Sequence, residues 1–213
     1  MLPAHLKEYS FVVKSLELFP DNNIRFIPDK YSILKIKNLH LIEQKPRCEE
    51  YDPELITKFA KYIKEKVNLH SADPLMKKIY ISRKNAGRRT LSNEDDVINV
   101  FKKFGYSILN CENLSLNEQI SIFSNASTIA SLHGAGLTNM IWMEKGSKVL
   151  EMHREIKERK DHHSFVYFTL ASSLSLDYYY IWCQNDNYSD FFEGVLQVNI
   201  DKLETVLNLM NNE

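Results

Sequence analysis

A glycine-rich segment near the middle of the chain has the residue types of a phosphate-binding turn. It reads His133-Gly134-Ala135-Gly136 and follows the apolar run 128–132. Glycine has no Cβ, so the backbone of such a turn can approach a ligand closely. The first amides of a following helix lack partners within the helix, and the helix dipole adds positive charge there. The segment suits a phosphate, although a plain strand-to-helix turn with a packed histidine explains these residues equally well.

A basic segment follows a second apolar run, residues 78–82. Its sequence is Arg83-Lys84-Asn85-Ala86-Gly87-Arg88-Arg89. The planar guanidinium of arginine matches phosphate oxygens and stays charged. We expect Arg83 to be functional because it comes directly after the predicted strand, whereas a solvated loop is the plainer interpretation for Lys84. Together with the glycine-rich turn, this segment would suit a diphosphate.

Two carboxylates stand where they could contribute to such a site. Glu151 ends the apolar run Val149-Leu150-Glu151 near the end of the predicted strand 148–152. A carboxylate there could accept hydrogen bonds from ribose hydroxyls, or be a simple surface charge. Glu94 lies in the first turn of a predicted helix, where it favours the helix dipole, so we interpret it as structural. Gln119 could be a surface position or reach a ligand, and nothing local decides.

Several familiar kinds of site are absent from the sequence. It contains no GxGxxG after a strand, no GxxxxGK[ST] and no GxSxG, which disfavours dinucleotide-dependent dehydrogenases, P-loop nucleotidases and nucleophile-elbow hydrolases. Its three cysteines are widely spaced, so they indicate neither a zinc site nor a disulfide framework. His153, His162 and His163 have no carboxylate at metal-ligand spacing. We expect no metal and no cofactor.

Composition is that of an ordinary globular protein. The 213 residues are 44% hydrophobic and 26% charged, with a formal net charge of −1. This charge gives no general attraction to nucleic acid or to anionic membranes. No apolar stretch is long enough to span a bilayer, and the N-terminus lacks the pattern of a signal peptide. The cysteine pattern fits a reducing compartment, so we expect a cytoplasmic location, with peripheral membrane attachment as the alternative.

The elements that must position these residues alternate between strands and helices. Strands are predicted at 24–27, 31–36, 78–82, 106–109, 128–132, 148–152 and 177–182. Helices are predicted at 4–19, from Asp52-Pro53 to 67, from a capping-box-like sequence at 92–95 to 104, from a capping box at 115–118 through 123, from the glycine-rich turn to 143, at 163–174, and from Asp201 as cap to 210. The alternation predicts an α/β, Rossmann-like parallel sheet flanked by helices. Ligands bind such sheets beyond the carboxyl ends of the strands, near a topological switch point.

The polar blocks, taken together, resemble a known family. They are YISR at 80–83, RR at 88–89, NE at 93–94, EQ at 118–119, HGAGLTNM at 133–140 and VLE at 149–151. Their order and spacing resemble those of the family 61 glycosyltransferases over about residues 77–152, with a weaker continuation to about 185. The resemblance implies the C-terminal, donor-binding domain of a GT-B-like architecture at 51–213. Residues 1–50 would be a remnant of the N-terminal domain or an interdomain segment.

The resemblance also implies a function. It is inverting transfer of a sugar from a nucleotide-sugar, a UDP-sugar, to a glycan or polysaccharide acceptor, as in polysaccharide biosynthesis. The residues that would bind the donor phosphates are Arg83, Arg88, Arg89, His133, Gly134, Ala135, Gly136 and Asn139. Glu151 would lie near the nucleotide ribose. No catalytic base is assigned, and no metal is required, because fixed donors and arginine can stabilise the leaving diphosphate.

Two other hypotheses remain open. Relatives in this family are usually longer, so the chain could be a truncated, catalytically silent nucleotide-sugar-binding module that needs a partner chain with the N-terminal domain. It could also be a structural remnant without a ligand. The arginines and the glycine-rich turn argue against the remnant, because together they would have no purely structural reason.

Overall fold

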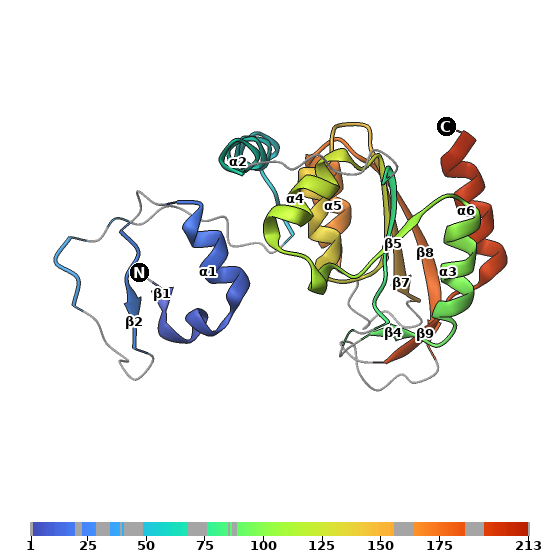
Figure 1. The fold of residues 1–213 in the computed structure, drawn as a ribbon, viewed down its shortest axis with the longest axis horizontal. Coiled ribbons are helices and arrows are strands. Elements are labelled where there is room, and N and C mark those ends of the chain that lie inside the picture. Colours follow the sequence, from blue (N-terminus) through green and yellow to red (C-terminus); the bar gives the residue numbers. More distant parts are fainter. Residues whose placement is uncertain are drawn as a thin grey trace.

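A curled, mostly parallel seven-stranded sheet with helices on both faces forms the centre of the computed structural model, which confirms the Rossmann-like α/β prediction (Figure 1). The structure describes residues 2–19, 23–28, 35–38, 40, 49–67, 76–84, 86, 89–155, 164–185 and 194–212. No helix in these ranges is long and apolar enough to cross a membrane.

The large sheet has a doubly wound strand order. Its strands are β3 (Lys78–Ile81), β4 (Thr90–Leu91), β5 (Ser107–Leu109), β6 (Thr128–Leu132), β7 (Lys148–Arg154), β8 (Asp177–Asn185) and β9 (Val195–Gln197). They lie in the order β4-β9-β8-β7-β6-β3-β5, and β8 with β9 is the antiparallel pair. From β3 the chain crosses to β5 on one side and then returns to β6 on the other. The crevice between β3 and β6 is therefore the topological switch point.

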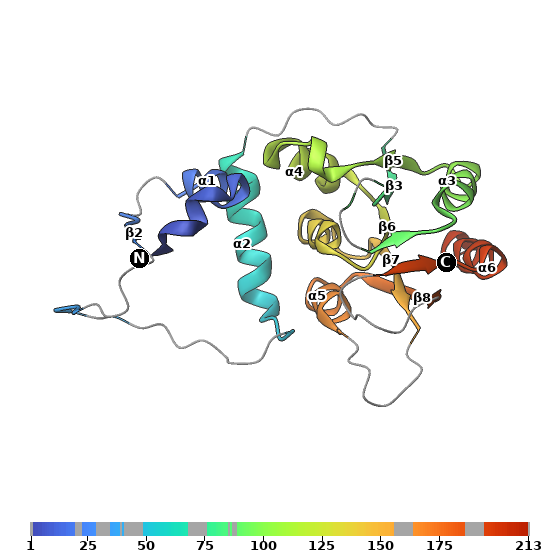
Figure 2. The same cartoon turned by 90° about the horizontal axis from the view of Figure 1, so that it is seen from below.

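Helices cover the two faces of this sheet (Figure 2). On one face lie α4 (Leu116–Asn125), the 3-10 helix η3 (Ala135–Trp142) and α5 (Val166–Ser173), and we call it the α4 face. On the opposite face, the α3 face, lie α3 (Glu94–Lys103) and α6 (Ile200–Asn212). The helix α2 (Pro53–Lys66) contacts η3 from outside, and η2 (Cys111–Asn113) precedes α4.

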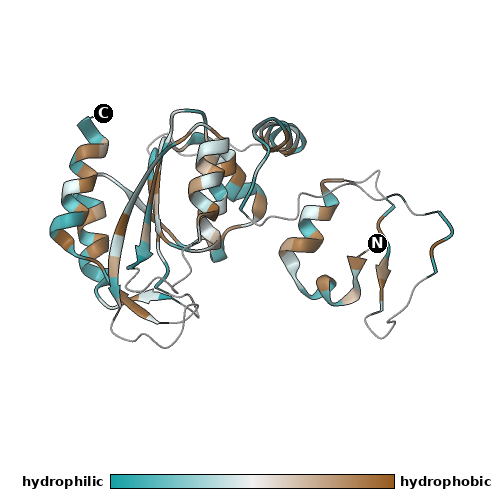
Figure 3. Ribbon diagram, turned by 180° about the vertical axis from the view of Figure 1, so that it is seen from behind, coloured by the Kyte–Doolittle hydropathy of each residue, from teal (hydrophilic) through white to brown (hydrophobic). Residues whose placement is uncertain are grey.

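Alternation along the strands supplies both cores. Ile79, Ile129 and Val149 are fully buried toward the α4 face, and Tyr80 is fully buried toward the α3 face. The rings of Tyr80 and Phe101 stack with centroids 4.3 Å apart. Helices α3 and α6 show alternating hydrophilic and hydrophobic bands, as expected for helices with one buried side (Figure 3).

The N-terminal segment differs from its prediction. The expected helix 4–19 is divided into η1 (Ala4–Glu8) and α1 (Ser10–Glu17), because Tyr9 between them is extended. A separate two-stranded parallel sheet joins β1 (Leu2–Pro3) to β2 (Phe26–Ile27). Of the predicted strand 31–36, residues 31–34 lie outside the described residues, and 35–36 form no strand.

Helix caps were predicted with mixed success. Asp52 accepts hydrogen bonds from two amides of α2, and the capping box of Ser115 with Glu118 is present, so both predictions are confirmed. The sequence at 92–95 is not a capping box, because the N-cap Asn93 makes no side-chain cap bond. Asp201 lies within the first turn of α6, and the Asn199 carboxamide oxygen accepts from the Lys202 amide at 2.9 Å instead.

Strand boundaries also changed. The short strands β4 and β9 were not predicted, because strands of two or three residues carry almost no periodicity. Strand β7 runs to Arg154 rather than ending at 152, and β8 runs to Asn185 rather than 182. The extension of β7 places Glu151 inside a strand, where the sequence interpretation had it at a strand end.

Asn93→Ala tests how the end of β9 is joined to the start of α3. The Asn93 Nδ2 donates to the Val198 carbonyl at 2.8 Å, and its Oδ1 accepts from the Val198 amide at 3.1 Å. Without these bonds two backbone groups lose their partners, and the free energy of unfolding should fall by about 1–3 kcal/mol in urea denaturation. The exposed Asn117→Ala is the matched control. Equal stability of the two variants would contradict this assignment.

Candidate active site

The polar and charged residues that could bind a ligand lie at the carboxyl ends of neighbouring strands. Arg83 follows β3 and His133 follows β6, so they lie on the two sides of the switch point. The His133 amide donates to the Met152 carbonyl at 2.8 Å, which continues the β6–β7 pairing. By strand alternation, His133 and Glu151 belong to the α4 face. The predicted location of the site at this edge is consistent with the fold.

A groove of about 570 Å³ opens at the switch point. Its lining includes Ser82 and Arg83 at the end of β3, Ala135 and Gly136 of the turn, and Gln119 of α4. This volume lies in the range of small-molecule sites, and its position obeys the rule for doubly wound sheets.

Gly134 is required by a close approach. A Cβ at this position would lie 2.3 Å from Arg83 Nη1, so a larger residue would displace the guanidinium. The backbone itself is extended, with φ 165° and ψ 170°, which any residue can adopt. At Gly136 a Cβ would lie 3.1 Å from the Cγ2 of Ile81. The absence of Cβ atoms thus brings the turn against β3 and its arginine.

The helix after the turn is a 3-10 helix rather than an α-helix. The Asn139 Nδ2 donates to the Gly136 carbonyl at 3.2 Å, and such side-chain bonds compete with α-helical bonding. The same group donates to Gln119 Oε1 at 2.9 Å, while Asn139 Oδ1 accepts from Trp142 Nε1 at 3.2 Å. Asn139 and Gln119 therefore connect the turn to α4, although both also line the groove.

Two guanidinium groups lie close together beside the turn. The Arg83 Nε donates to the Arg89 carbonyl at 3.1 Å, and burial together with the charge of Arg89 lowers the pKa of Arg83. Arginine still remains charged near neutral pH. The Arg89 Nε is buried and has no hydrogen-bond acceptor among the residues the structure describes. An anion at this position would relieve both the repulsion and the missing hydrogen bond.

The other basic residues of this segment behave differently. Lys84 is exposed, and its ammonium forms an ion pair with Asp95 at 2.7 Å, in agreement with the plainer interpretation of that residue. Arg88 lies outside the described residues.

A buried carboxylate holds the end of β3 from the α3 face. Glu94 is 5% exposed, and its Oε1 accepts from the Ser82 hydroxyl at 2.6 Å and from the Arg83 amide at 3.0 Å. The Tyr80 hydroxyl also donates to it, at 3.1 Å, and burial together with Glu94 raises the pKa of Tyr80. Glu94 is structural, as predicted, but it acts by fixing the backbone from which Arg83 projects.

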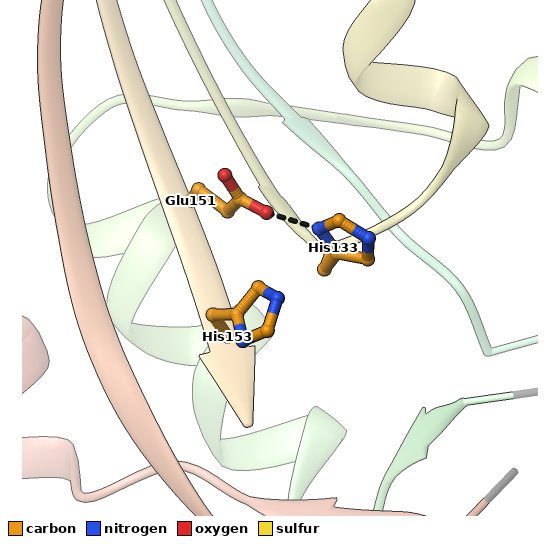
Figure 4. Close-up of side chains that lie close together, drawn as sticks. All are labelled: His133, Glu151 and His153. Carbon is orange, nitrogen blue, oxygen red and sulfur yellow. Dashed lines mark hydrogen bonds and ion pairs between the residues drawn. The ribbon is translucent and has the colours of Figure 1, made fainter. Parts of the chain in front are cut away.

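A second buried carboxylate connects three strands. Glu151 is 1% exposed in the middle of β7. One of its oxygens is hydrogen-bonded to His133 Nδ1 at the end of β6 (Figure 4). The other accepts from the Tyr178 hydroxyl of β8. Burial and the charge of Glu151 raise the pKa of Tyr178. Both carboxylate oxygens are thus engaged within the sheet, which the predicted strand-end position did not anticipate.

These bonds fix the orientation of His133. Because its Nδ1 faces a carboxylate, Nδ1 is the donor, and Nε2 points away from Glu151 (Figure 4). The His133 ring makes edge contacts with the rings of His153 and Tyr167, with centroids 4.6 and 5.1 Å apart. With its side chain 14% exposed, His133 can offer Nε2 to a ligand.

The same residues include donors of the types that bind metals. The ligating atoms of His133, Glu151 and His153 lie within 4.8 Å of one another. Two imidazoles and a carboxylate suit zinc, although the sequence spacing had predicted no metal site. Since both Glu151 oxygens already accept hydrogen bonds, we interpret the group as a hydrogen-bonded network. His162 and His163 lie outside the described part of the chain.

Sequence reasoning missed Tyr178 as a partner of this site. One signal could have identified it. Residues at alternate positions of a strand share one face of the sheet. On this face the first residues of β6 and β7 are apolar, and polar residues follow them: Ser131 and His133 on one strand, and Glu151 and His153 on the next. The same alternation continues through Tyr178, Tyr180 and Trp182.

Comparison with known proteins gives one result for the family. The family model described as Glycosyltransferase 61 matches residues 3–150, more than half of the chain. The matched region contains Arg83, Arg89 and the glycine-rich turn, and it also includes the N-terminal segment. No significant match to a curated protein was found.

Tyr178→Phe tests the buried hydrogen bond through alkaline stability. The folded state keeps Tyr178 protonated above its ordinary pKa of about 10, so the unfolded state loses this proton first. The contribution is complete below pH 10 and is lost as pH rises further, by up to about 1.4 kcal/mol per pH unit. Urea denaturation at pH 8, 10 and 11 should show a smaller alkaline loss for the variant.

The exposed Tyr62→Phe is the control and should retain the full alkaline loss. Burial also raises the pKa values of Tyr80 and Tyr106. Both residues are unchanged in the two variants, so their contribution to the alkaline loss is the same in each protein. An unchanged slope in Tyr178→Phe would show that its hydroxyl is not held as described.

Proposed function

The chain belongs to the glycosyltransferase 61 family, and we propose that it binds a UDP-sugar at the β3–β6 switch point and transfers the sugar to a glycan acceptor. The transfer proceeds with inversion at the anomeric carbon. Residues 51–213 form the donor-binding half of a GT-B-like enzyme, and residues 1–50 belong to its N-terminal or interdomain part.

The observation that carries this proposal is the cationic corner of the switch-point groove. Arg83 lines the groove there. Arg89 lies beside Arg83, and its buried Nε has no acceptor in the described part of the chain. The first amides of η3, at Ala135 and Gly136, have no partner within their helix. A diphosphate has several negatively charged oxygens, which can accept the hydrogen bonds that these groups donate.

The same groups can assist the reaction. The oxygen of the acceptor hydroxyl attacks the anomeric carbon while the bond from that carbon to the diphosphate oxygen breaks. The electron pair stays on the diphosphate, and the hydroxyl proton passes to water. Negative charge therefore grows on the leaving group. Arg83, Arg89 and the η3 amides stabilise this charge more strongly in the transition state than in the bound donor, which is what accelerates a reaction.

His133 completes the phosphate site as an imidazolium, in which Nδ1 donates to Glu151 and the outward Nε2 donates to a phosphate oxygen. We assign Glu151 to holding that ring, rather than to the ribose contact suggested by sequence, because both its oxygens are engaged by His133 and Tyr178. Asn139 supports the turn through its bond to Gln119. Its predicted phosphate contact and that of Arg88 remain predictions.

A module that binds nucleotide-sugars without transferring them would have the same donor site. The two functions differ in the fate of the donor. A transferase releases UDP from a UDP-sugar faster when an oligosaccharide acceptor is present, and a silent module does not.

Calorimetric titration with UDP tests the shared donor site. Arg83→Ala removes a charge-assisted contact and should weaken UDP binding by about 1.5–3 kcal/mol, roughly tenfold to a hundredfold. Lys84→Ala, which removes the same charge one residue away, should bind UDP normally because Lys84 pairs with Asp95. An absence of UDP binding at millimolar concentration would exclude both functions.

A second variant checks how Arg83 is placed. Gly134→Ala keeps an allowed backbone but pushes a Cβ toward the Arg83 guanidinium. It should weaken UDP binding on its own and add little to Arg83→Ala, because it acts through the same side chain. Full additivity of the two changes would argue against that route.

Turnover tests the link between His133 and Glu151. His133→Ala and Glu151→Gln should each slow UDP release from UDP-sugars by about tenfold or more, since removal of one fixed donor commonly costs at least this much. The double variant should be no slower than the slower single variant, because Glu151 acts through His133. Asp177→Asn, at the exposed start of β8, is the control and should be unaffected. Independent effects that multiply would contradict the link.

A further inference from the structure

Four aromatic side chains form a continuous row beside the pair of His133 and Glu151. Tyr178, Tyr180 and Trp182 alternate along β8 and so share the α4 face, where Phe168 of α5 joins them. The ring centroids are 5.5 Å apart for Phe168 and Tyr178, 6.5 Å for Tyr178 and Tyr180, and 5.1 Å for Tyr180 and Trp182. We call these four residues the aromatic row.

The aromatic row is connected to His133 at two points. Tyr178 donates to Glu151, the carboxylate that holds His133. The Trp182 ring lies 5.9 Å from the His153 ring, which in turn contacts His133. A ligand that covers the row therefore extends directly to the proposed reacting centre.

The outer part of the row is open to solvent. Tyr180 is 53% exposed, and Phe168 is also exposed at its side of α5. Single exposed aromatic residues need no explanation, but adjacent rings along one strand present a continuous apolar surface. The C–H face of a pyranose ring matches the face of an aromatic ring by area and dispersion, while its hydroxyl groups stay at the edge.

A groove of about 320 Å³ begins where the aromatic row ends at Phe168. It is lined by Glu49, Glu50 and Asp52 together with serine and threonine side chains of α5, and no lysine or arginine contributes to its described lining. Carboxylate and hydroxyl oxygens accept hydrogen bonds from sugar hydroxyls. The acidic lining opposes an anionic ligand such as a nucleotide.

The donor and the aromatic row lie on opposite sides of His133. The switch-point groove lies between β3 and β6, whereas the aromatic row follows β8 beyond β7. In a nucleotide-sugar the diphosphate joins the nucleoside to the sugar. With the diphosphate at Arg83 and His133, one side is available to the nucleoside and the other to the sugars.

We propose that the aromatic row and the acidic groove form the acceptor subsite, which binds a neutral oligosaccharide. One pyranose ring stacks on Tyr180, and the following residues of the glycan extend past Phe168 toward Glu50 and Ser172. Glu49 forms the wall behind them, because its two oxygens accept from Ser164 and from the Phe165 amide. This assignment rests on the proposed function for its meaning as an acceptor site, but saccharide binding can be measured independently of transfer.

The test is titration of the full chain with cellotetraose, xylotetraose and N-acetylated chitotetraose as neutral probes, and with tetragalacturonate as the anionic counterpart. At least one neutral probe should bind, as detected by NMR or tryptophan fluorescence. Tetragalacturonate should bind more weakly. Tyr180→Ala should weaken the bound neutral probe at least fivefold without changing UDP affinity. Tyr9→Ala, a tyrosine 50% exposed on the N-terminal segment, should change neither.

Several results would overturn the proposal. They are no binding of any neutral probe, equal or tighter binding of tetragalacturonate, and unchanged saccharide binding in Tyr180→Ala. A loss of UDP affinity with unchanged saccharide binding would instead assign the aromatic row to the nucleobase. Phe168→Ala repeats the test if circular dichroism shows that Tyr180→Ala does not fold. Failure of the proposed function is separate, because it appears as absent UDP binding by the unaltered chain.

Discussion

A carboxylate buried at the centre of a sheet is costly unless donors satisfy both of its oxygens. Glu151 meets this condition with one donor from each neighbouring strand, His133 from β6 and Tyr178 from β8. The interaction therefore fixes the relative positions of three neighbouring strands. It also aims the outward nitrogen of His133, so the geometry of the whole edge depends on the register of β6, β7 and β8.

The α4 face changes its character along the strands. Near the starts of β6 and β7, Ile129 and Val149 pack under α4, η3 and α5. Further along the same face come His133, just after β6, and Glu151, in the middle of β7. On the α3 face, Glu94 fixes the end of β3, because its carboxylate accepts a hydrogen bond from the Arg83 amide.

Several local features followed directly from the sequence. The Asp52 cap and the capping box at 115–118 were predictable because a cap involves residues only two or three positions apart. The same reasoning failed at 92–95, where Asn93 pairs with Val198 across the sheet edge, and at Asp201, where the preceding Asn199 takes the capping bond. Competition from residues distant in the chain, or from a close neighbour, decided these two cases.

The sequence by itself determined the alternation of strands and helices, the glycine-rich turn after β6 and the arginine after β3. These features arise from periodicity and from residue types that act over a few positions. Only the tertiary structure decided that Glu151 faces His133 and Tyr178, that Gly134 makes room for Arg83, and that the aromatic row continues from this group. The physical reason is that parallel pairing joins segments separated by a whole crossover, and their register is set by packing between helices and sheet rather than by any local pattern.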